Sequence, residues 1–431
     1  MAHSPNKVVD ILPVLVYHIK KSWLASHKAL TQKTGVDIMV SEKILTNLSR
    51  SSWIRAMFEE GARLRKIAGA DNVYDFSLGN PDLEPPATVK EALKKAVISD
   101  APKMHSYMSN AGYPEVRAAV AAKLKQSTGV AIGAEHIVME CGAGGAMNVV
   151  LKTLLNPSEE VIVLAPYFAE YLFYIDNHGG RPVIVNTDRE SFQPDADRIY
   201  DAITPRTKAI IINSPNNPTG AIYSRGSLER ISEAIEKRQK EFGTSICIIS
   251  DEPYDKIVYD AAEVPPIFAI FKNAVIVNSF SKSLSLPGER IGFIAVNPGT
   301  SDISALMDGL IFSTRTLGFV NAPALFQRIL PESLDARVDV QAYKKRRDML
   351  YEIITNAGFK CLKPQGAFYL FPQSPVEDDV AFCKAAVKYN LVIVPGTGFG
   401  CKGFFRLAYC VDEKTIVNSQ KAFEALAAEY R

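Results

Sequence analysis

Residues 279–293 read SFSKSLSLPGERIGF, and they follow a run of apolar residues, AVIVN. The pattern places a single lysine, Lys282, where a buried strand ends and small residues begin. Burial disfavours the charged form of an amine, so such a lysine is poised to attack a carbonyl group and hold a Schiff base. The hydroxyls of Ser279 and Ser281 and the guanidinium of Arg290 are donors suited to a phosphate dianion. An amine beside a phosphate clamp indicates pyridoxal 5'-phosphate as the cofactor.

The spacing of this stretch, Ser-x-Ser-Lys followed by Gly-x-Arg-x-Gly, resembles the cofactor-lysine motif of the class I, aspartate aminotransferase-like family of fold-type I pyridoxal phosphate enzymes. A lone Ser-x-Ser-Lys segment is more often an ordinary exposed turn, so the identification depends on the motifs elsewhere in the chain. The resemblance extends over roughly residues 50–425. It implies an α/β fold with a mostly parallel seven-stranded sheet flanked by helices in a large domain, and a smaller α+β domain.

Alternating strand and helix patterns over residues 75–300 predict the mostly parallel sheet independently, with ligands gathered at the carboxyl ends of its strands. We expect residues 75–315 to form the large cofactor-binding domain, and residues 39–74 together with 316–431 to form the small domain. Residues 1–38 are an extension of unknown role. Their apolar segment is too short to span a bilayer and is not followed by a signal-peptide cleavage pattern.

Composition indicates a globular protein that acts on small molecules. The chain has 431 residues, of which 47% are hydrophobic, and its net charge of +2 argues against nucleic-acid and membrane surfaces. The six cysteines include no Cys-x-x-Cys pair, which fits a reducing, cytoplasmic location. The six histidines include no helical pair with metal-ligand spacing, so we expect no metal.

A glycine-rich turn at residues 142–146 is a second candidate phosphate anchor. It joins a predicted strand, 137–141, to a predicted helix, 147–155. A small-residue turn that opens a helix presents free N–H groups and the positive end of the helix dipole to an anion. By resemblance, the residues that cover the phosphate are Gly142, Ala143 and Gly144.

Further positions match residues that surround the cofactor ring in the resembling family, and each follows a predicted buried strand. Phe168 matches the aromatic residue that stacks on the ring. Asn217, in an Asn-Pro-Thr-Gly turn, and Tyr254 match the hydrogen-bond partners of the phenolic oxygen. Asp251 matches the carboxylate that pairs with the pyridinium nitrogen and makes the ring an electron sink. From the sequence, Phe168 fits a core residue nearly as well. Asp251 taken singly fits a loop acid, but the Asp-x-x-Tyr pattern and its order relative to Lys282 favour the family role. The resemblance implies that Lys282, Asp251 and Tyr254 are catalytic.

Three positions match the substrate-binding residues of the family: Gly79, Asn217 and Arg406. An arginine inside an apolar strand, as at Arg406, is costly unless it is paired, and its fork of N–H groups fits a carboxylate. Tyr107 lies in a Tyr-(x)4-Gly-x-Pro segment similar to the one whose tyrosine crosses a dimer interface to the phosphate. The resemblance therefore implies a homodimer with shared active sites.

Beyond the predicted sheet, the pattern changes to long helices, expected at residues 304–313 and 336–356. The second carries four consecutive cations, residues 344–347, which we expect on a solvated face. Further strands are expected at residues 366–371 and 391–394.

The resemblance implies an aminotransferase that moves an amino group between an L-amino acid and a 2-oxo acid, with 2-oxoglutarate as the expected acceptor. Two alternatives stay open: a carbon–sulfur β-lyase that uses the same cofactor residues, and an aminotransferase-like regulatory protein. In aspartate-specific relatives a second arginine receives the side-chain carboxylate. Thr316 aligns there, with Arg315 one residue away, so we expect neutral or aromatic amino acids to react at least as readily as aspartate.

Overall fold

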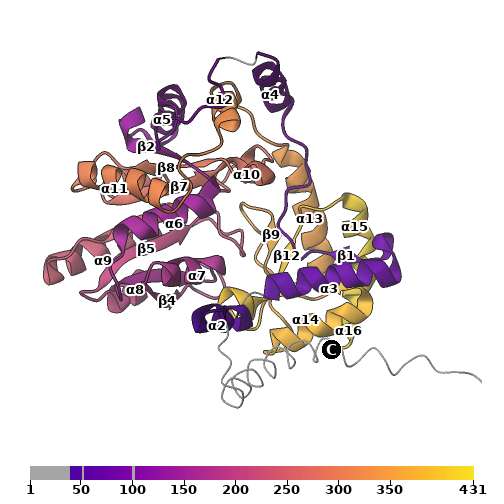
Figure 1. The fold of residues 1–431 in the computed structure, drawn as a ribbon. Coiled ribbons are helices and arrows are strands. Elements are labelled where there is room, and N and C mark those ends of the chain that lie inside the picture. Colours follow the sequence, from indigo (N-terminus) through magenta and orange to yellow (C-terminus); the bar gives the residue numbers. More distant parts are fainter. Residues whose placement is uncertain (1–38, 51–52, 100–101) are drawn as a thin grey trace, which may run out of the picture. The chain divides into compact units, whose positions relative to one another are not determined.

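The computed structural model describes residues 39–50, 53–99 and 102–431 (Figure 1). The chain divides into two units, residues 1–55 and 56–431, which are considered separately. The described part of the first unit contains helix α2 (Glu42–Arg50) and the first residues of helix α3 (Trp53–Ala68). The rest of α3 belongs to the second unit. No helix within the described ranges is long and apolar enough to cross a membrane.

The second unit is built on a seven-stranded sheet with the order β2-β8-β7-β6-β5-β3-β4. The strands are β2 (Ile137–Glu140), β3 (Glu160–Ala165), β4 (Arg181–Asn186), β5 (Thr207–Asn213), β6 (Cys247–Asp251), β7 (Ala274–Ser279) and β8 (Gly292–Val296). β8 runs antiparallel to both of its neighbours, and every other pairing in the sheet is parallel. The predicted mostly parallel sheet is confirmed.

Successive strand residues point to opposite faces of this sheet, and each face packs against helices. Ile249 and Val275 belong to the core shared with α6 (Gly142–Leu154), α7 (Glu170–Asn177) and α11 (Ile303–Thr316). Ile248 and Ile276 belong to the core on the other face, shared with α5 (Pro114–Thr128), α8 (Ala196–Ala202), α9 (Arg225–Phe242) and α12 (Ala324–Ser333), against which α4 (Ala87–Ser99) also packs. The central strands are buried on both sides, so they read as continuous apolar runs in the sequence.

A third hydrophobic core lies among the C-terminal elements, drawn in orange and yellow in Figure 1. Here β1 (Tyr74–Asp75) pairs with β10 (Leu391–Val392), and β11 (Val394–Pro395), β12 (Phe405–Ala408) and β9 (Tyr369–Leu370) form a small antiparallel sheet. The surrounding helices are α13 (Val340–Asn356), α14 (Asp379–Ala386), α15 (Glu413–Asn418) and α16 (Gln420–Ala428). Tyr254 and Tyr259, which follow β6, pack into the same core.

Several predicted boundaries are wrong. Helix α6 begins at Gly142 instead of 147, so the glycine-rich segment is the start of the helix itself. The helix expected at 336–356 begins at Val340, where the Asp339 side chain accepts hydrogen bonds from two backbone N–H groups. The separate helix α12 before it was not predicted; it contains Pro331, which favours a helix end.

The expected solvated face of α13 is also wrong for two of its four cations. Arg346 is 9% exposed and Arg347 is 0% exposed. Arg347 donates to the carbonyl oxygen of Pro364 at 2.9 Å and pairs with Asp260 at 2.7 Å. Its guanidinium also lies 4.7 Å from the centre of the Tyr259 ring. The paired charges and the aromatic surface compensate for removing this cation from water.

Candidate active site

Lys282 lies in the short helix α10 (Phe280–Ser283), directly after the carboxyl end of β7. Its amine donates a hydrogen bond of 2.9 Å to the carbonyl oxygen of Gly79. The pKa of Lys282 is lowered to about 8, mainly by burial; Cys410 opposes this shift, and the nearby cations Arg406 and Arg290 contribute to it. A substantial fraction of the amine is therefore neutral near pH 8, as a nucleophilic lysine requires.

Two of the predicted phosphate-binding residues, Gly142 and Arg290, meet at the start of α6. Gly142 has a φ of +73°, and a Cβ atom there would lie 3.0 Å from Nη2 of Arg290, so the guanidinium covers the beginning of the helix. Ala143 and Gly144 follow in the first turn, where backbone N–H groups lack helical partners. Ser279 and Ser281 are buried at the end of β7 and in α10, immediately before Lys282.

Asp251 is the last residue of β6 and is 7% exposed. Its Oδ2 atom accepts a hydrogen bond from the Tyr171 hydroxyl, whereas its Oδ1 atom is buried and has no hydrogen-bond partner within the described ranges. Burial raises the pKa of Asp251 to about 6, and the hydrogen bond from Tyr171 opposes this rise. One oxygen of this carboxylate is thus held by the protein and the other is available to a donor from a ligand.

Tyr254 and Asn217 are each connected to the small antiparallel sheet. The Tyr254 hydroxyl lies 2.8 Å from the hydroxyl of Tyr369 in β9. The side-chain oxygen of Asn217 accepts a hydrogen bond of 3.2 Å from Nη1 of Arg406 in β12. Phe168 is half-buried and makes an edge contact with Tyr171, with ring centres 5.5 Å apart.

Arg406 is a buried cation, 2% exposed. Its Nη2 atom donates to the carbonyl oxygen of Ser77 at 2.6 Å, and its guanidinium lies 4.7 Å from the centres of the Tyr369 and Phe399 rings. Its Nε atom is buried and without a partner among the residues that the structure describes, and no carboxylate in those ranges forms an ion pair with this arginine. Burial lowers the pKa of Arg406. An uncompensated buried guanidinium favours binding of an anion, and its geometry suits a carboxylate.

Tyr107 is 89% exposed and forms no hydrogen bond or ring contact with any of these residues. Three contacts at the site were not found from the sequence: those of Tyr171, Tyr369 and Tyr174. Tyr174 lies opposite Gly144, where a Cβ atom would be 3.3 Å from its hydroxyl. No local pattern marks these tyrosines, and only the folded chain places them beside their partners.

These residues fit pyridoxal 5'-phosphate. The free Oδ1 atom of Asp251 provides an acceptor for a pyridinium N–H group, and the half-buried amine of Lys282 provides the nucleophile for the aldehyde. Gly142, beneath the guanidinium of Arg290, leaves open backbone for a phosphate where a side chain would intrude. Across the described residues, no group of three or more potential metal ligands is placed to hold a metal ion.

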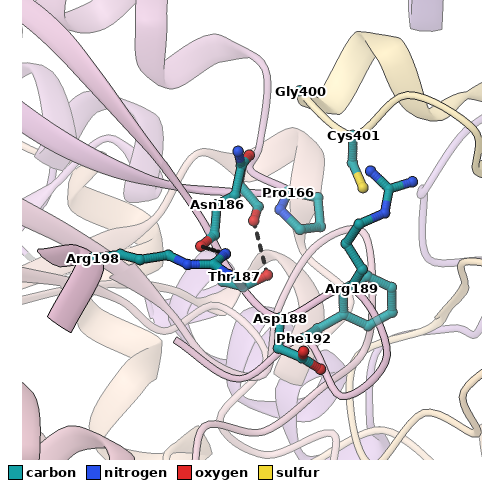
Figure 2. Close-up of a pocket in the computed structure, with 10 residues that line it drawn as sticks. Pro166, Asn186, Thr187, Asp188, Arg189, Phe192, Arg198, Gly400 and Cys401 are labelled. Atoms are coloured by element: carbon teal, nitrogen blue, oxygen red, sulfur yellow. Dashed lines mark hydrogen bonds between the residues drawn. The ribbon is translucent and has the colours of Figure 1, made fainter. Parts of the chain in front are cut away.

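A separate cavity of about 340 Å³ lies between the ends of β3 and β4 and the segment around residue 400 (Figure 2). Pro166, Asn186 and Thr187 form part of its wall, and the side chains of Arg189 and Arg198 approach it from the chain that follows β4. None of the residues predicted to hold the cofactor lines this cavity. It is therefore distinct from the site described above.

Known proteins resemble this chain over most of its length. A family model, aminotransferase class I and II, matches residues 71–423. Aspartate/prephenate aminotransferase of Thermus thermophilus is 34% identical over 360 residues, which cover 82% of this chain and 89% of that protein. The structure of an amino transferase from Eubacterium rectale has a TM-score of 0.89 at 40% identity and covers 92% of this chain and 100% of the other.

Aspartate aminotransferase from Thermus thermophilus with maleate has a TM-score of 0.80 at 28% identity, and the match covers 90% of this chain and 100% of that one. The matched family model and these relatives span both the large sheet and the C-terminal elements that carry Arg406. The chain therefore belongs to the aminotransferase class I and II family, with the aspartate aminotransferase-like fold: it is a transaminase whose cofactor is pyridoxal 5'-phosphate.

Proposed function

We propose that this transaminase moves an amino group between an L-amino acid and 2-oxoglutarate, with Lys282, Asp251 and Tyr254 as catalytic residues. The observation that carries the proposal is Arg406, a buried guanidinium without a carboxylate partner in the described ranges, whose charge also acts on Lys282. Both substrates carry a carboxylate next to the reacting carbon. One arginine can therefore bind each of them in turn in the same orientation.

The proposed roles follow from the contacts of the chain. Arg406 binds the substrate carboxylate together with Asn217, while the backbone at Gly79 closes over it. This attachment would hold the Cα–H bond toward Lys282, whose amine, once it is not linked to the cofactor, would remove the proton from Cα and carry it. Asp251 keeps the ring nitrogen protonated, so the bound cofactor supplies an electron sink for the charge released at Cα.

The remaining proposed contacts hold the cofactor in place. The phosphate is bound by backbone and side chains at Gly142, Ala143, Gly144, Ser279, Ser281 and Arg290. Phe168 would stack on the ring, and Asn217 and Tyr254 would donate to its phenolic oxygen. Tyr107 completes the phosphate site of a neighbouring subunit in a homodimer, which accounts for a tyrosine ring that is 89% exposed in its own chain.

For the amino donor, we propose neutral or aromatic amino acids at least as readily as aspartate. Arg315 is exposed at the C-terminal end of α11, where its guanidinium lies 5.3 Å from the centre of the Phe312 ring. Arg315 thus packs on a residue of its own helix, and this position gives no support for a role in binding a second carboxylate of the substrate. The name of the Thermus relative joins aspartate with prephenate, so that relative is also associated with a substrate other than aspartate.

A panel of amino donors with 2-oxoglutarate as acceptor, read by glutamate formation, tests the proposal. Lys282→Ala is the reference without activity, and it should also lose the visible absorption of the lysine–cofactor linkage. A preference for aspartate above about a hundredfold, roughly 2.7 kcal/mol of discrimination, would contradict the proposed donor range. Arg315→Ala should then remove that preference. Pyruvate released from a cysteine conjugate without any acceptor would instead identify a β-lyase.

A further inference from the structure

Tyr369 is a buried tyrosine to which the sequence analysis assigned no role. It lies in β9 of the small antiparallel sheet and is 2% exposed. Its hydroxyl is 2.8 Å from that of Tyr254, and the two rings meet edge to face with centres 5.9 Å apart. The guanidinium of Arg406 lies 4.7 Å from the centre of the Tyr369 ring. One side chain therefore contacts both the proposed phenolic-oxygen donor and the proposed carboxylate-binding arginine.

Tyr369 also occupies the space beside Gly79. A Cβ atom built at Gly79 would lie 2.0 Å from the Tyr369 hydroxyl oxygen, far inside contact distance. The glycine is thus the only residue type that leaves this hydroxyl where it is. Because the carbonyl of Gly79 accepts the hydrogen bond from Lys282, the position of Tyr369 is linked to the backbone that holds the catalytic amine.

The direction of the hydrogen bond between the two hydroxyls follows from the proposed role of Tyr254. The two oxygens are close enough for one hydrogen bond, and either could be its donor. Burial raises the pKa of both phenols, so both keep their protons at neutral pH. Each phenol has a single proton to donate. If Tyr254 donates its proton to the phenolic oxygen of the cofactor, it can only accept from Tyr369.

We propose that Tyr369 is a positioning residue of the transamination reaction: its hydroxyl donates to Tyr254, which orients the proton of Tyr254 toward the phenolic oxygen of the cofactor, and its ring supports Arg406. The inference rests on the proposed role of Tyr254. A hydroxyl that receives a hydrogen bond becomes a stronger donor, since neighbouring bonds in a low-dielectric site polarise one another. Stronger donation to the phenolic oxygen withdraws charge from it and makes the nearby nitrogen of the lysine–cofactor linkage less basic.

The test is the pH at which the visible band of the cofactor-loaded protein titrates. Tyr369→Phe keeps the ring and removes the hydroxyl, so the midpoint should rise by about half a pH unit. Tyr259→Phe is the matched control, since it removes a buried hydroxyl that donates to the carbonyl oxygen of Ala367 in the same core. The control should leave the midpoint unchanged. An unchanged midpoint in Tyr369→Phe, or a fall, would overturn the proposal.

A double variant tests whether Tyr369 acts through Tyr254. Once Tyr254→Phe has removed the accepting hydroxyl, adding Tyr369→Phe should not move the midpoint further, because the two changes interrupt the same connection. Additive shifts would show that Tyr369 acts elsewhere and would overturn the inference. Failure of the proposed function is a separate result: it would appear as a visible band that survives in Lys282→Ala.

The supporting role of the ring is measured by comparing Tyr369→Phe with Tyr369→Leu. The phenylalanine variant should lower kcat about fivefold and leave the KM for the amino donor within about twofold, because the aromatic surface under Arg406 remains. The leucine variant should raise that KM about tenfold. Equal KM values in the two variants would contradict the role of the ring. Melting temperatures identify a leucine variant that fails to fold, and in that case the titration of Tyr369→Phe decides the proposal.

Discussion

Asp251 is prepared for a cationic partner by two opposing effects. Burial raises its pKa to about 6, and the hydrogen bond from Tyr171 favours the ionised form. A carboxyl group whose pKa is raised loses its negative charge as the pH falls through that pKa. Ionised Asp251 is the form that pairs with a pyridinium nitrogen, so affinity of the cofactor-free protein for pyridoxal 5'-phosphate should weaken as the pH falls toward 6 and below.

Tyr171→Phe removes the stabilising hydrogen bond, so the pKa of Asp251 should rise further. The decline in cofactor affinity on acidification should then begin at a higher pH, while affinities at pH 8 should differ little. Fluorescence titration of the cofactor-free protein between pH 5 and 8 measures this directly. Tyr223→Phe, which removes another buried hydroxyl without touching Asp251, serves as the control. A pH profile identical to wild type would show that Tyr171 does not control this carboxylate.

Some site residues could be predicted from the sequence pattern around them, and others could not, because their contacts are with residues far away in the sequence. Asp251 ends one buried strand and Lys282 closely follows another, so the strand pattern alone places them at one edge of the sheet. Tyr171 and Tyr369 reach their partners across 80 and 115 residues, respectively, and neither stands in a distinctive motif. Their roles depend on the packing of separate elements, which no local periodicity encodes.

Among the elements, α13 shows how a charge run can mislead. Arg347 lies four residues after buried Tyr343 and three before buried Leu350, so helical periodicity places it on the inner face. Lys345 lies on the outer face and pairs with Glu413 at 2.6 Å. Composition alone suggests that all four cations are exposed to solvent, whereas the helical periodicity of the buried residues places Arg347 inside.

Arg347→Ala should lower the free energy of unfolding by about 3 kcal/mol, because it removes a fully buried side chain that packs on the Tyr259 ring and takes a donor from the carbonyl oxygen of Pro364. Lys345→Ala is the matched control on the same helix and should cost less than about 1 kcal/mol, as exposed ion pairs usually do. Denaturant unfolding at fixed protein concentration, with and without cofactor, measures both. Equal losses in the two variants would mean that burial of Arg347 adds nothing to stability.

Some strands could also be predicted from the sequence and others could not, depending on the length of their apolar run. Those of the large sheet, such as β3 and β5, have six and seven residues, and each contains an unbroken apolar run, residues 161–165 and 209–212 respectively. The strands β10 and β11 have two residues each and belong to different sheets, with Ile393 between them. A single apolar run at residues 391–394 therefore predicted one strand, because nothing local tells where the chain leaves one partner strand for another.

At the scale of the whole molecule, the site combines residues from opposite ends of the sequence. The segment at residues 77–79 joins two of these residues through its backbone. Lys282 donates a hydrogen bond to the carbonyl oxygen of Gly79, and Arg406 donates one to the carbonyl oxygen of Ser77. We propose that residues 75–315 form the large domain and that Arg406 is contributed by the small one. Substrate binding would then stabilise contact between the two, since the carboxylate attaches to one domain and reacts on the other.

One proposed contact is not made within the chain itself. Tyr107 is 89% exposed and forms no hydrogen bond with a described residue, whereas Gly142 and Arg290 lie together at the start of α6. Contribution of this tyrosine by a second subunit requires a closed dimer in which each site borrows from the other chain. The dimer should therefore be needed for activity as well as for stability.

Mixed dimers test this arrangement. Tyr107→Ala and Lys282→Ala should each be impaired alone, the first by loss of a phosphate donor and the second by loss of the catalytic amine. In a hybrid of the two, one site receives Lys282 from the first chain and Tyr107 from the second, so it is intact. Random pairing at equal amounts makes half the dimers hybrid with one good site each, which should restore about a quarter of wild-type activity. If Tyr107 served its own chain, no hybrid would contain an intact site, and the mixture would show only the average of the two variants.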